Sequence, residues 1–156
     1  MKASELMTTT VVTVTADNTV GDAVHLLAEH RVRQIPIVDA EKKVFGLITS
    51  RILMRAILPR YITKGYLKDV MFAPELEQFT DGLNAIKDKK ISDFIKEDPK
   101  LVKTGYACVG PDTTAMEIAA LFVNSDIPVD RIMVVDEGKK LLGLISPVDL
   151  FRKKQA

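Results

Sequence analysis

The chain has 156 residues, 47% of them hydrophobic and 28% charged, which is typical of a globular protein. Its formal net charge is +1, so no basic excess supports nucleic-acid binding by phosphate neutralisation. The single cysteine excludes an internal disulfide and a cysteine-only zinc site within one chain, and it is consistent with a reducing compartment. The sequence shows neither a signal-peptide core nor an apolar run of the about 20 residues that a membrane helix needs. We therefore expect a cytoplasmic location and no membrane contact.

The first 58 residues predict alternating strands and helices. Thr19 offers an N-cap, and the apolar residues after it recur with helical spacing. Short β-branched or apolar runs before and after this helix predict strands. The expected elements are a strand at 11–14, a helix from 20 to about 28, strands at 35–38 and 44–49, and a short helix at 50–58 that ends before Pro59.

Residues 59–90 form a connector that is too apolar for a disordered linker. Residues 75–90 predict a helix with Leu76, Phe79, Leu83 and Ile86 on one face. We interpret the segment as a packed connector, and a lid or a dimer surface is the alternative. The remaining residues predict a strand at 107–109, a helix from Thr114 to about Asn124, strands at 131–135 and 141–145, and a closing helix from Pro147.

The order of elements in the second half repeats that in the first. Val134-Val135-Asp136 and Gly143 follow Ile37-Val38-Asp39 and Gly46 by 97 positions, and Thr114 follows Thr19 by 95. Further upstream, Ala3-Ser4-Glu5-Leu6-Met7 corresponds to Ile91-Ser92-Asp93-Phe94-Ile95. The order β-α-β-β-α therefore occurs twice and predicts an α/β fold. A unit of about 55 residues is small to be stable alone, so we expect the two units to share a core.

Several segments of both copies carry a family resemblance. They are Leu6-Met7-Thr8, Val12-Thr13-Val14, Ile35-Pro36-Ile37-Val38-Asp39, Gly46-Leu47-Ile48-Thr49, Ile91-Ser92-Asp93, Met133-Val134-Val135-Asp136 and Gly143-Leu144-Ile145-Ser146-Pro147-Val148-Asp149. The chain thereby resembles the CBS (cystathionine β-synthase) domain family over about residues 1–58 and 91–153. The resemblance implies two tandem β-α-β-β-α units, 1–58 and 91–156, packed as a pseudo-twofold pair with a helical connector at 59–90.

In this family a Ser or Thr, and an Asp three residues later, hold the ribose and phosphate of a nucleotide. The second copy has Ser146 and Asp149, whereas Ile52 takes the place of the acid after Thr49 in the first copy. A carboxylate accepts charge-assisted hydrogen bonds and isoleucine accepts none, so we expect one competent site, built on the second copy. The residues that the resemblance implies for it are Thr104, Tyr106, Ala107, Val129, Asp130, Arg131, Ile132, Ser146 and Asp149.

The resemblance also implies a weaker second site with Thr13, Arg33 and Thr49, although for Arg33 a plain surface position is the favoured interpretation. Asp130 departs from the family pattern, and it could accept the adenine amine or repel phosphate. Ser146-Pro147-Val148-Asp149 also matches a helix start, with Ser as N-cap, Pro at the first position and an acid at the third. Helix capping is therefore an alternative role for this motif, and the two roles can coexist.

The resemblance implies a regulatory module that binds AMP, ADP, ATP or S-adenosylmethionine, modulates a partner protein and forms a homodimer. The alternative is a dimerisation or scaffold module with an unused cleft, which the missing acid at Ile52 favours. We expect no catalytic residue and no catalytic cofactor, because the sequence has no nucleophile elbow, phosphate-cradling glycine loop or zincin helix.

Two further features of the sequence have plain structural interpretations. His25 and Glu29 lie one helical turn apart, and without further ligands nearby we interpret them as a surface pair and expect no metal site. Cys108 falls in a strand that we expect to be buried, where a free cysteine acts as a small hydrophobic residue.

Overall fold

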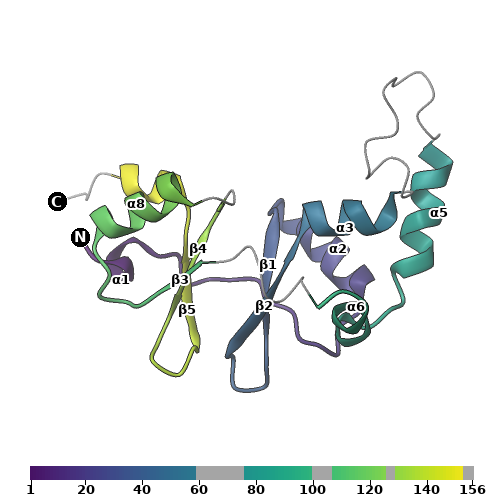
Figure 1. Ribbon diagram of the computed structural model, residues 1–156, viewed down its shortest axis with the longest axis horizontal. Coiled ribbons are helices and arrows are strands. Elements are labelled where there is room, and N and C mark those ends of the chain that lie inside the picture. Colours follow the sequence, from purple (N-terminus) through teal and green to yellow (C-terminus); the bar gives the residue numbers. More distant parts are fainter. Residues whose placement is uncertain (59–75, 100–106, 126–128, 153–156) are drawn as a thin grey trace.

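The computed structural model describes residues 1–58, 76–99, 107–125 and 129–152. Its elements form two lobes, each with a small sheet flanked by helices (Figure 1). The first lobe contains α2 (Val20–His30), β1 (Gln34–Val38), β2 (Val44–Thr49), α3 (Ser50–Ile57), α5 (Leu76–Ile86) and α6 (Ile91–Glu97). The second lobe contains α1 (Ala3–Leu6), β3 (Ala107–Val109), α8 (Ala115–Asn124), β4 (Ile132–Val135), β5 (Leu141–Ile145) and the 3-10 helix η2 (Pro147–Phe151). This alternation confirms the predicted α/β class.

The two long helices of the repeat, α2 and α8, begin at the predicted threonines. The Thr19 hydroxyl accepts a hydrogen bond of 3.1 Å from the Asp22 N–H, and the Asp22 carboxylate accepts one of 2.9 Å from the Thr19 N–H. Thr114 and Glu117 make the same reciprocal pair, at 3.3 and 2.8 Å. Each pair is a capping box that satisfies backbone N–H groups at a helix start, so the sequence motif fixes where both helices begin.

The sheets pair strands close in sequence. In the first lobe β1 and β2 are antiparallel, and in the second β4 lies between parallel β3 and antiparallel β5. The strand predicted at 11–14 is wrong, because only Val14 pairs there, as a single parallel bridge to Ile37. The reason is that this segment crosses between the lobes: Thr8 exchanges backbone hydrogen bonds with Leu144 of β5, and Val14 bonds to β1.

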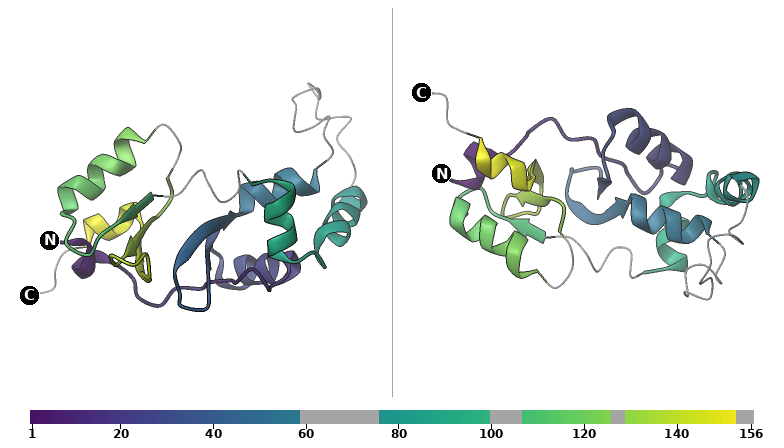
Figure 2. Two further views of the ribbon diagram at one scale, coloured as in Figure 1. Left: turned by 60° about the horizontal axis from the view of Figure 1, so that its bottom comes forward. Right: turned by 90° about the horizontal axis from the view of Figure 1, so that it is seen from above.

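The two copies exchange their opening helices. The buried side chains of α1, Ala3 and Leu6, belong to the core of the second lobe, whereas Ile91 and Phe94 of α6 belong to the core of the first. Backbone hydrogen bonds fix both placements, from Ala3 N–H to the Thr113 carbonyl at 2.8 Å and from the Ile91 N–H to the Asn18 carbonyl at 2.8 Å. Figure 2 shows the chain after α1 passing to the opposite lobe. Because each lobe contains the opening helix of the other copy, the exchange joins the two lobes through their cores.

A separate apolar cluster joins the lobes. Its buried members come from the hairpins of both lobes and are Val38, Val44, Leu47, Met133, Val135 and Leu144. The hairpins also bond to each other, from the Val44 N–H to the Lys139 carbonyl and from the Leu141 N–H to the Lys42 carbonyl, both at 3.0 Å. The shared core that the small size of each unit predicts is therefore present.

Three smaller expectations differ from the structure. The closing segment from Pro147 is a 3-10 helix, and the helix predicted over 75–90 ends at Ile86. Cys108 is exposed, so its predicted burial is wrong, because β3 is an edge strand whose side chains alternate and only Val109 is buried. Among the described helices, none combines the length and apolarity that a membrane crossing requires.

Candidate functional site

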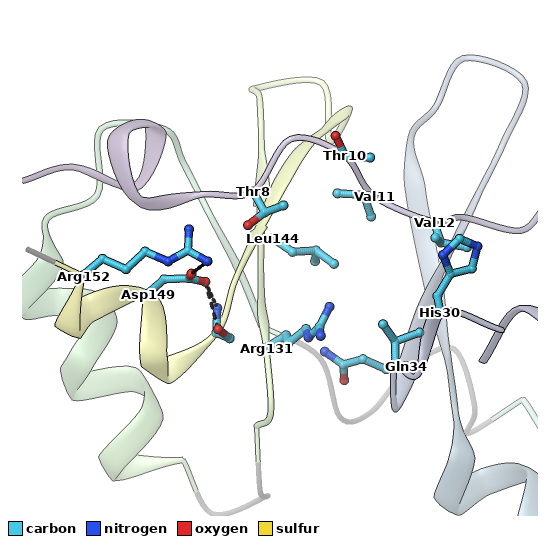
Figure 3. Close-up of a pocket in the computed structure, with 12 residues that line it drawn as sticks. Thr8, Thr10, Val11, Val12, His30, Gln34, Arg131, Leu144, Asp149 and Arg152 are labelled. Atoms are coloured by element: carbon cyan, nitrogen blue, oxygen red, sulfur yellow. Dashed lines mark hydrogen bonds and ion pairs between the residues drawn. The ribbon is translucent and has the colours of Figure 1, made fainter. Parts of the chain in front are cut away.

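A cavity of about 330 Å³ lies between the two lobes (Figure 3). Its wall has three parts: the crossing segment after α1, the end of α2 with the start of β1, and the end of β5 with η2. The lining residues are Thr8, Thr10, Val11, Val12, His30, Val32, Gln34, Arg131, Leu144, Ser146, Asp149 and Arg152. Both lobes and the exchanged N-terminal segment are therefore needed to form the cavity.

Asp149 supplies a buried carboxylate, 4% exposed, on the second-lobe wall. Its Oδ2 accepts hydrogen bonds from the Ser146 N–H at 2.7 Å and the Ser146 hydroxyl at 2.9 Å. Its Oδ1 forms an ion pair of 3.1 Å with Arg152 Nη2. The capping role predicted as an alternative for this motif is thus confirmed. A carboxylate offers about four acceptor positions, so Asp149 keeps acceptor capacity for a ligand hydroxyl.

Arg131 reaches the cavity from the residue before β4, and its side chain is half-buried. Within the described residues it makes no ion pair and no side-chain hydrogen bond. The lining contains two guanidinium groups, of Arg131 and Arg152, and one carboxylate, of Asp149. Its formal charge is therefore +1 with His30 neutral. A cavity that excludes part of the solvent strengthens the attraction of this charge for an anion.

Gln34 lies at the start of β1 on the first-lobe wall and is 7% exposed. Its side-chain nitrogen, Nε2, has no hydrogen-bond partner. Among the described residues it is the one buried side-chain polar atom of this kind. An unsatisfied buried donor costs about 1–3 kcal/mol. Figure 3 shows the Gln34 amide and the Arg131 guanidinium directed into the same part of the cavity from opposite lobes. Two donors therefore converge in a part of the cavity where the described residues supply no acceptor to Nε2.

The crossing segment is held against β5 at a glycine. Thr8 and Leu144 exchange hydrogen bonds of 2.8 and 3.0 Å, which brings Thr8 onto the cavity wall. A Cβ atom on Gly143 would lie 2.8 Å from both the Thr8 carbonyl oxygen and the Met7 sulfur. The absence of a side chain at Gly143 is therefore what allows this part of the wall to approach β5.

The structure brings three of the predicted site residues, Arg131, Ser146 and Asp149, together in the cavity. Four others do not line it. Ile132 is fully buried in the second-lobe core, Ala107 pairs with it in the sheet, Val129 packs against the same core and Asp130 is exposed. Thr104 and Tyr106 lie outside the described residues.

The residues predicted for a weaker second site are placed apart. The Thr49 hydroxyl caps α3 by accepting a hydrogen bond of 3.1 Å from the Ile52 N–H. Arg33 is exposed, and its carbonyl accepts a hydrogen bond of 2.8 Å from the Ser50 N–H. Thr13 lines a different cavity, of about 130 Å³, beside Val38 and Leu141. The described residues thus give no joint arrangement of these three side chains.

Four of the cavity residues that the sequence does not predict are related to predicted ones by the repeat. Val11 and Val12 precede Tyr106 and Ala107 by 95 positions, and Val32 and Gln34 precede Val129 and Arg131 by 97. The structure places these first-copy residues in the cavity with Ser146 and Asp149, whereas of their described second-copy equivalents only Arg131 lines it. The internal offset was the signal that could have found them, because a pseudo-twofold pair places each edge against the other copy.

Two exposed features of the described residues carry no site. His25 and Glu29 form a surface contact of 3.5 Å, as predicted, and no group of three or more metal-ligating side chains occurs in the described ranges. Partial packing around the Cys108 thiol raises its pKa, against a smaller opposing effect of Lys139. A thiol with a raised pKa is less nucleophilic at neutral pH, so Cys108 is not an activated nucleophile.

The chain is similar to known proteins both in sequence and in fold. The chain is 25% identical to an inosine-5'-monophosphate dehydrogenase of Methanocaldococcus jannaschii over 156 residues, which span only 24% of that protein. A CBS domain-containing protein from Bacillus anthracis has a TM-score of 0.70 at 15% identity, with 97% of this chain and 90% of that chain covered. Arabidopsis thaliana CBSX2 in complex with AMP has a TM-score of 0.64 at 19% identity, covering 97% and 93%.

The family model for the CBS domain matches residues 3–59 and 91–155, which correspond to the two copies of the repeat. Together the matches cover most of the chain. The spacing of repeated motifs, the paired lobes and these matches agree, and the chain belongs to the CBS domain family as a tandem pair.

Proposed function

We propose that this CBS pair is a regulatory module that binds an adenosine nucleotide in the cavity between its lobes. The observation that carries the proposal is the convergence of Ser146, Asp149 and Arg131 on one cavity opposite the first lobe. Asp149 supplies an acceptor for a ribose hydroxyl, and Arg131 supplies a cation for phosphate. The complex of CBSX2 with AMP supports this ligand class through a protein of the same fold.

The ligand acts by changing the relative positions of the lobes. The cavity wall includes both lobes and the segment that crosses between them. A ligand shifts a conformational equilibrium only by as much as it binds one arrangement better than another. A nucleotide that contacts both walls meets this condition, and the altered surface then modulates a partner protein. The module acts by binding and not by catalysis.

The test is calorimetric titration of the protein with AMP, ADP, ATP and S-adenosylmethionine. Asp149→Asn removes the carboxylate charge while keeping the size of the side chain, and Asp112→Asn is a matched control at an exposed carboxylate outside the cavity. We expect one site per chain, weakened in Asp149→Asn and unchanged in Asp112→Asn. Binding that survives Asp149→Asn would remove this cavity as the site, and absence of binding by all four ligands would refute the nucleotide role.

A second candidate function, a dimerisation or scaffold module, is favoured by an exposed apolar surface at the end of the second lobe. Met116 and Val123 of α8 are 80% and 81% exposed, and Val148 and Phe151 of η2 are 64% and 81% exposed. α8 and η2 contact each other at this end of the molecule, and large exposed apolar patches mark interaction surfaces. We propose that a homodimer forms through this surface and that it also accompanies the regulatory role.

Sedimentation equilibrium with and without AMP separates the two functions. A dimer lost in Val123→Glu and retained in Glu137→Gln, an exposed hairpin control, supports the surface as the interface. Dimerisation that no nucleotide affects, together with absence of nucleotide binding, would favour the scaffold role over the regulatory one.

A further inference from the structure

Gln34 is buried without a partner for its side-chain nitrogen, which sets it apart from the other residues of the cavity wall. It is 7% exposed, and its Nε2 has no hydrogen-bond partner. A buried polar group in a folded protein normally has a hydrogen-bond partner. A buried donor without one on a cavity wall therefore indicates that a bound ligand supplies the acceptor. Asp149 and Ser146 do not serve as that acceptor, because they lie on the opposite wall and Nε2 bonds to neither of them.

The chemistry of the missing acceptor follows from what lies beside Gln34. Arg131 enters the same part of the cavity from the other lobe and, within the described residues, has no anionic partner (Figure 3). Two N–H donors, one of them cationic, would be satisfied together by an oxygen that bears negative charge and has several lone pairs. A phosphate oxygen meets this requirement.

The charge of the wall disfavours one of the candidate ligands. With Arg131 and Arg152 against Asp149, the lining has a formal charge of +1. S-adenosylmethionine offers a carboxylate, but its sulfonium and ammonium groups give it a net positive charge at neutral pH, so this wall attracts it less than an anion. A nucleoside phosphate is an anion and is attracted.

We propose that Gln34 is a specificity-determining residue of the cavity: its Nε2 donates a hydrogen bond to a phosphate oxygen of the ligand, together with Arg131, and so selects nucleoside phosphates over nucleosides and over S-adenosylmethionine. This assignment rests on the proposed nucleotide-binding function. It also makes Gln34 a bridge between the lobes, because the phosphate oxygen then contacts β1 of the first lobe and Arg131 of the second.

The decisive variant is Gln34→Leu, which removes the donor with little change in volume. Asn84→Leu is the matched control, since it removes an exposed amide of α5 in the same lobe, outside the cavity. Calorimetry measures the affinities of AMP, adenosine and S-adenosylmethionine for each protein. A hydrogen bond to a charged acceptor corresponds to a change of about ten- to a hundredfold in affinity. We expect this loss for AMP in Gln34→Leu, no more than about a twofold change for adenosine, and neither change in Asn84→Leu.

Thermal unfolding of the free proteins supplies a second readout. Because the orphan donor is unfavourable without ligand, Gln34→Leu should melt at the same temperature as the wild type or higher. A melting temperature lowered by several degrees would show that the amide is already satisfied in the free protein, and would overturn the assignment.

The remaining outcomes are equally distinct. Equal weakening of AMP and adenosine would place Gln34 on the nucleoside, and unchanged AMP affinity would remove it from the site; either result overturns the assignment while leaving the proposed function intact. Tighter binding of S-adenosylmethionine than of AMP by the wild type overturns the selection of phosphate. Wild-type protein that binds none of the three ligands overturns the proposed function and this assignment together.

Discussion

The Asp149 carboxylate and the Arg152 guanidinium form an ion pair of 3.1 Å in which the acid is 5% exposed at its side chain and the arginine is 70% exposed. The buried partner also accepts two hydrogen bonds from Ser146. The carboxylate is therefore satisfied mainly from within its own turn, and Arg152 adds a contact that solvent screens. This asymmetry leads to different expectations for the two partners.

Asp149→Ala should lower the free energy of unfolding by about 1–2 kcal/mol, because it removes the cap of η2 and leaves the Ser146 N–H without its partner. Arg152→Ala should cost less than about 1 kcal/mol, since the ion pair is largely exposed on the arginine side. Urea unfolding followed by circular dichroism measures both. An equal loss of unfolding free energy in the two variants would show that Arg152 contributes as much to the stability as the bonds between Asp149 and Ser146.

The capping boxes of α2 and α8 predict an acid-sensitive contribution to stability. The backbone N–H groups of Thr19 and Thr114 hold the pKa values of Asp22 and Glu117 below their ordinary range. A carboxyl group with a lowered pKa in the folded state stabilises the fold above its unfolded pKa and loses this effect as the pH falls through the folded one. The contribution should therefore be complete at pH 7 and should decline below about pH 4.

Urea unfolding of Asp22→Asn/Glu117→Gln at pH 7 and pH 3 tests this expectation. The double variant should be less stable than the wild type at pH 7, and the difference should shrink at pH 3. Glu137→Gln, in an exposed hairpin turn, should show no such dependence. A difference of the same size at both pH values would show that the two carboxylates are not responsible.

The repeat made most of the fold predictable from the sequence. Equal offsets between Asp39 and Asp136 and between Gly46 and Gly143 located the hairpins, and the threonines at 19 and 114 located the helix starts. These features are local, because hairpin turns and caps depend on residues a few positions apart. The 11–14 segment differed because its hydrogen bonds go to two different sheets, which no local pattern records.

The sequence predicts which second-copy side chains belong to the site, but not which first-copy residues lie opposite them. Arg131, Ser146 and Asp149 were expected together and do line one cavity. Val32 and Gln34 were not expected, because their place opposite Asp149 depends on which lobe faces which edge, a relation between segments more than 100 residues apart. The orphan nitrogen of Gln34 is likewise a property of packing, since its burial and lack of partner exist only in the folded chain.

Gly143 should be sensitive to the smallest side chain. Gly143→Ala places a Cβ 2.8 Å from the Thr8 carbonyl and the Met7 sulfur, so the crossing segment must move. We expect a loss of about 1–3 kcal/mol in unfolding free energy from overpacking, and weaker AMP binding because Thr8 lines the cavity. Gly110→Ala is the control, since no atom lies within 4 Å of its added Cβ, and it should change stability by less than about 0.5 kcal/mol. An unchanged free energy of unfolding in Gly143→Ala would show that the crossing segment can move away from β5 without destabilising the protein.

The two hairpin turns carry matching strain that can be relieved. Lys42 and Lys139 adopt φ of 63° and 65°, a left-handed conformation that costs a residue with a Cβ about 1–2 kcal/mol. Glycine avoids this cost but loses about 0.5–1 kcal/mol in entropy on folding, so Lys42→Gly and Lys139→Gly should each stabilise the protein by about 0.5–1 kcal/mol. The bonds between the lobes use the backbone carbonyls of these lysines and are kept. Lys140→Gly, the next residue in the same turn but without positive φ, should be destabilising instead. Urea unfolding of the three variants decides the matter, because a loss of stability in all three would show that the lysine side chains, and not the backbone conformation, determine the stability of these turns.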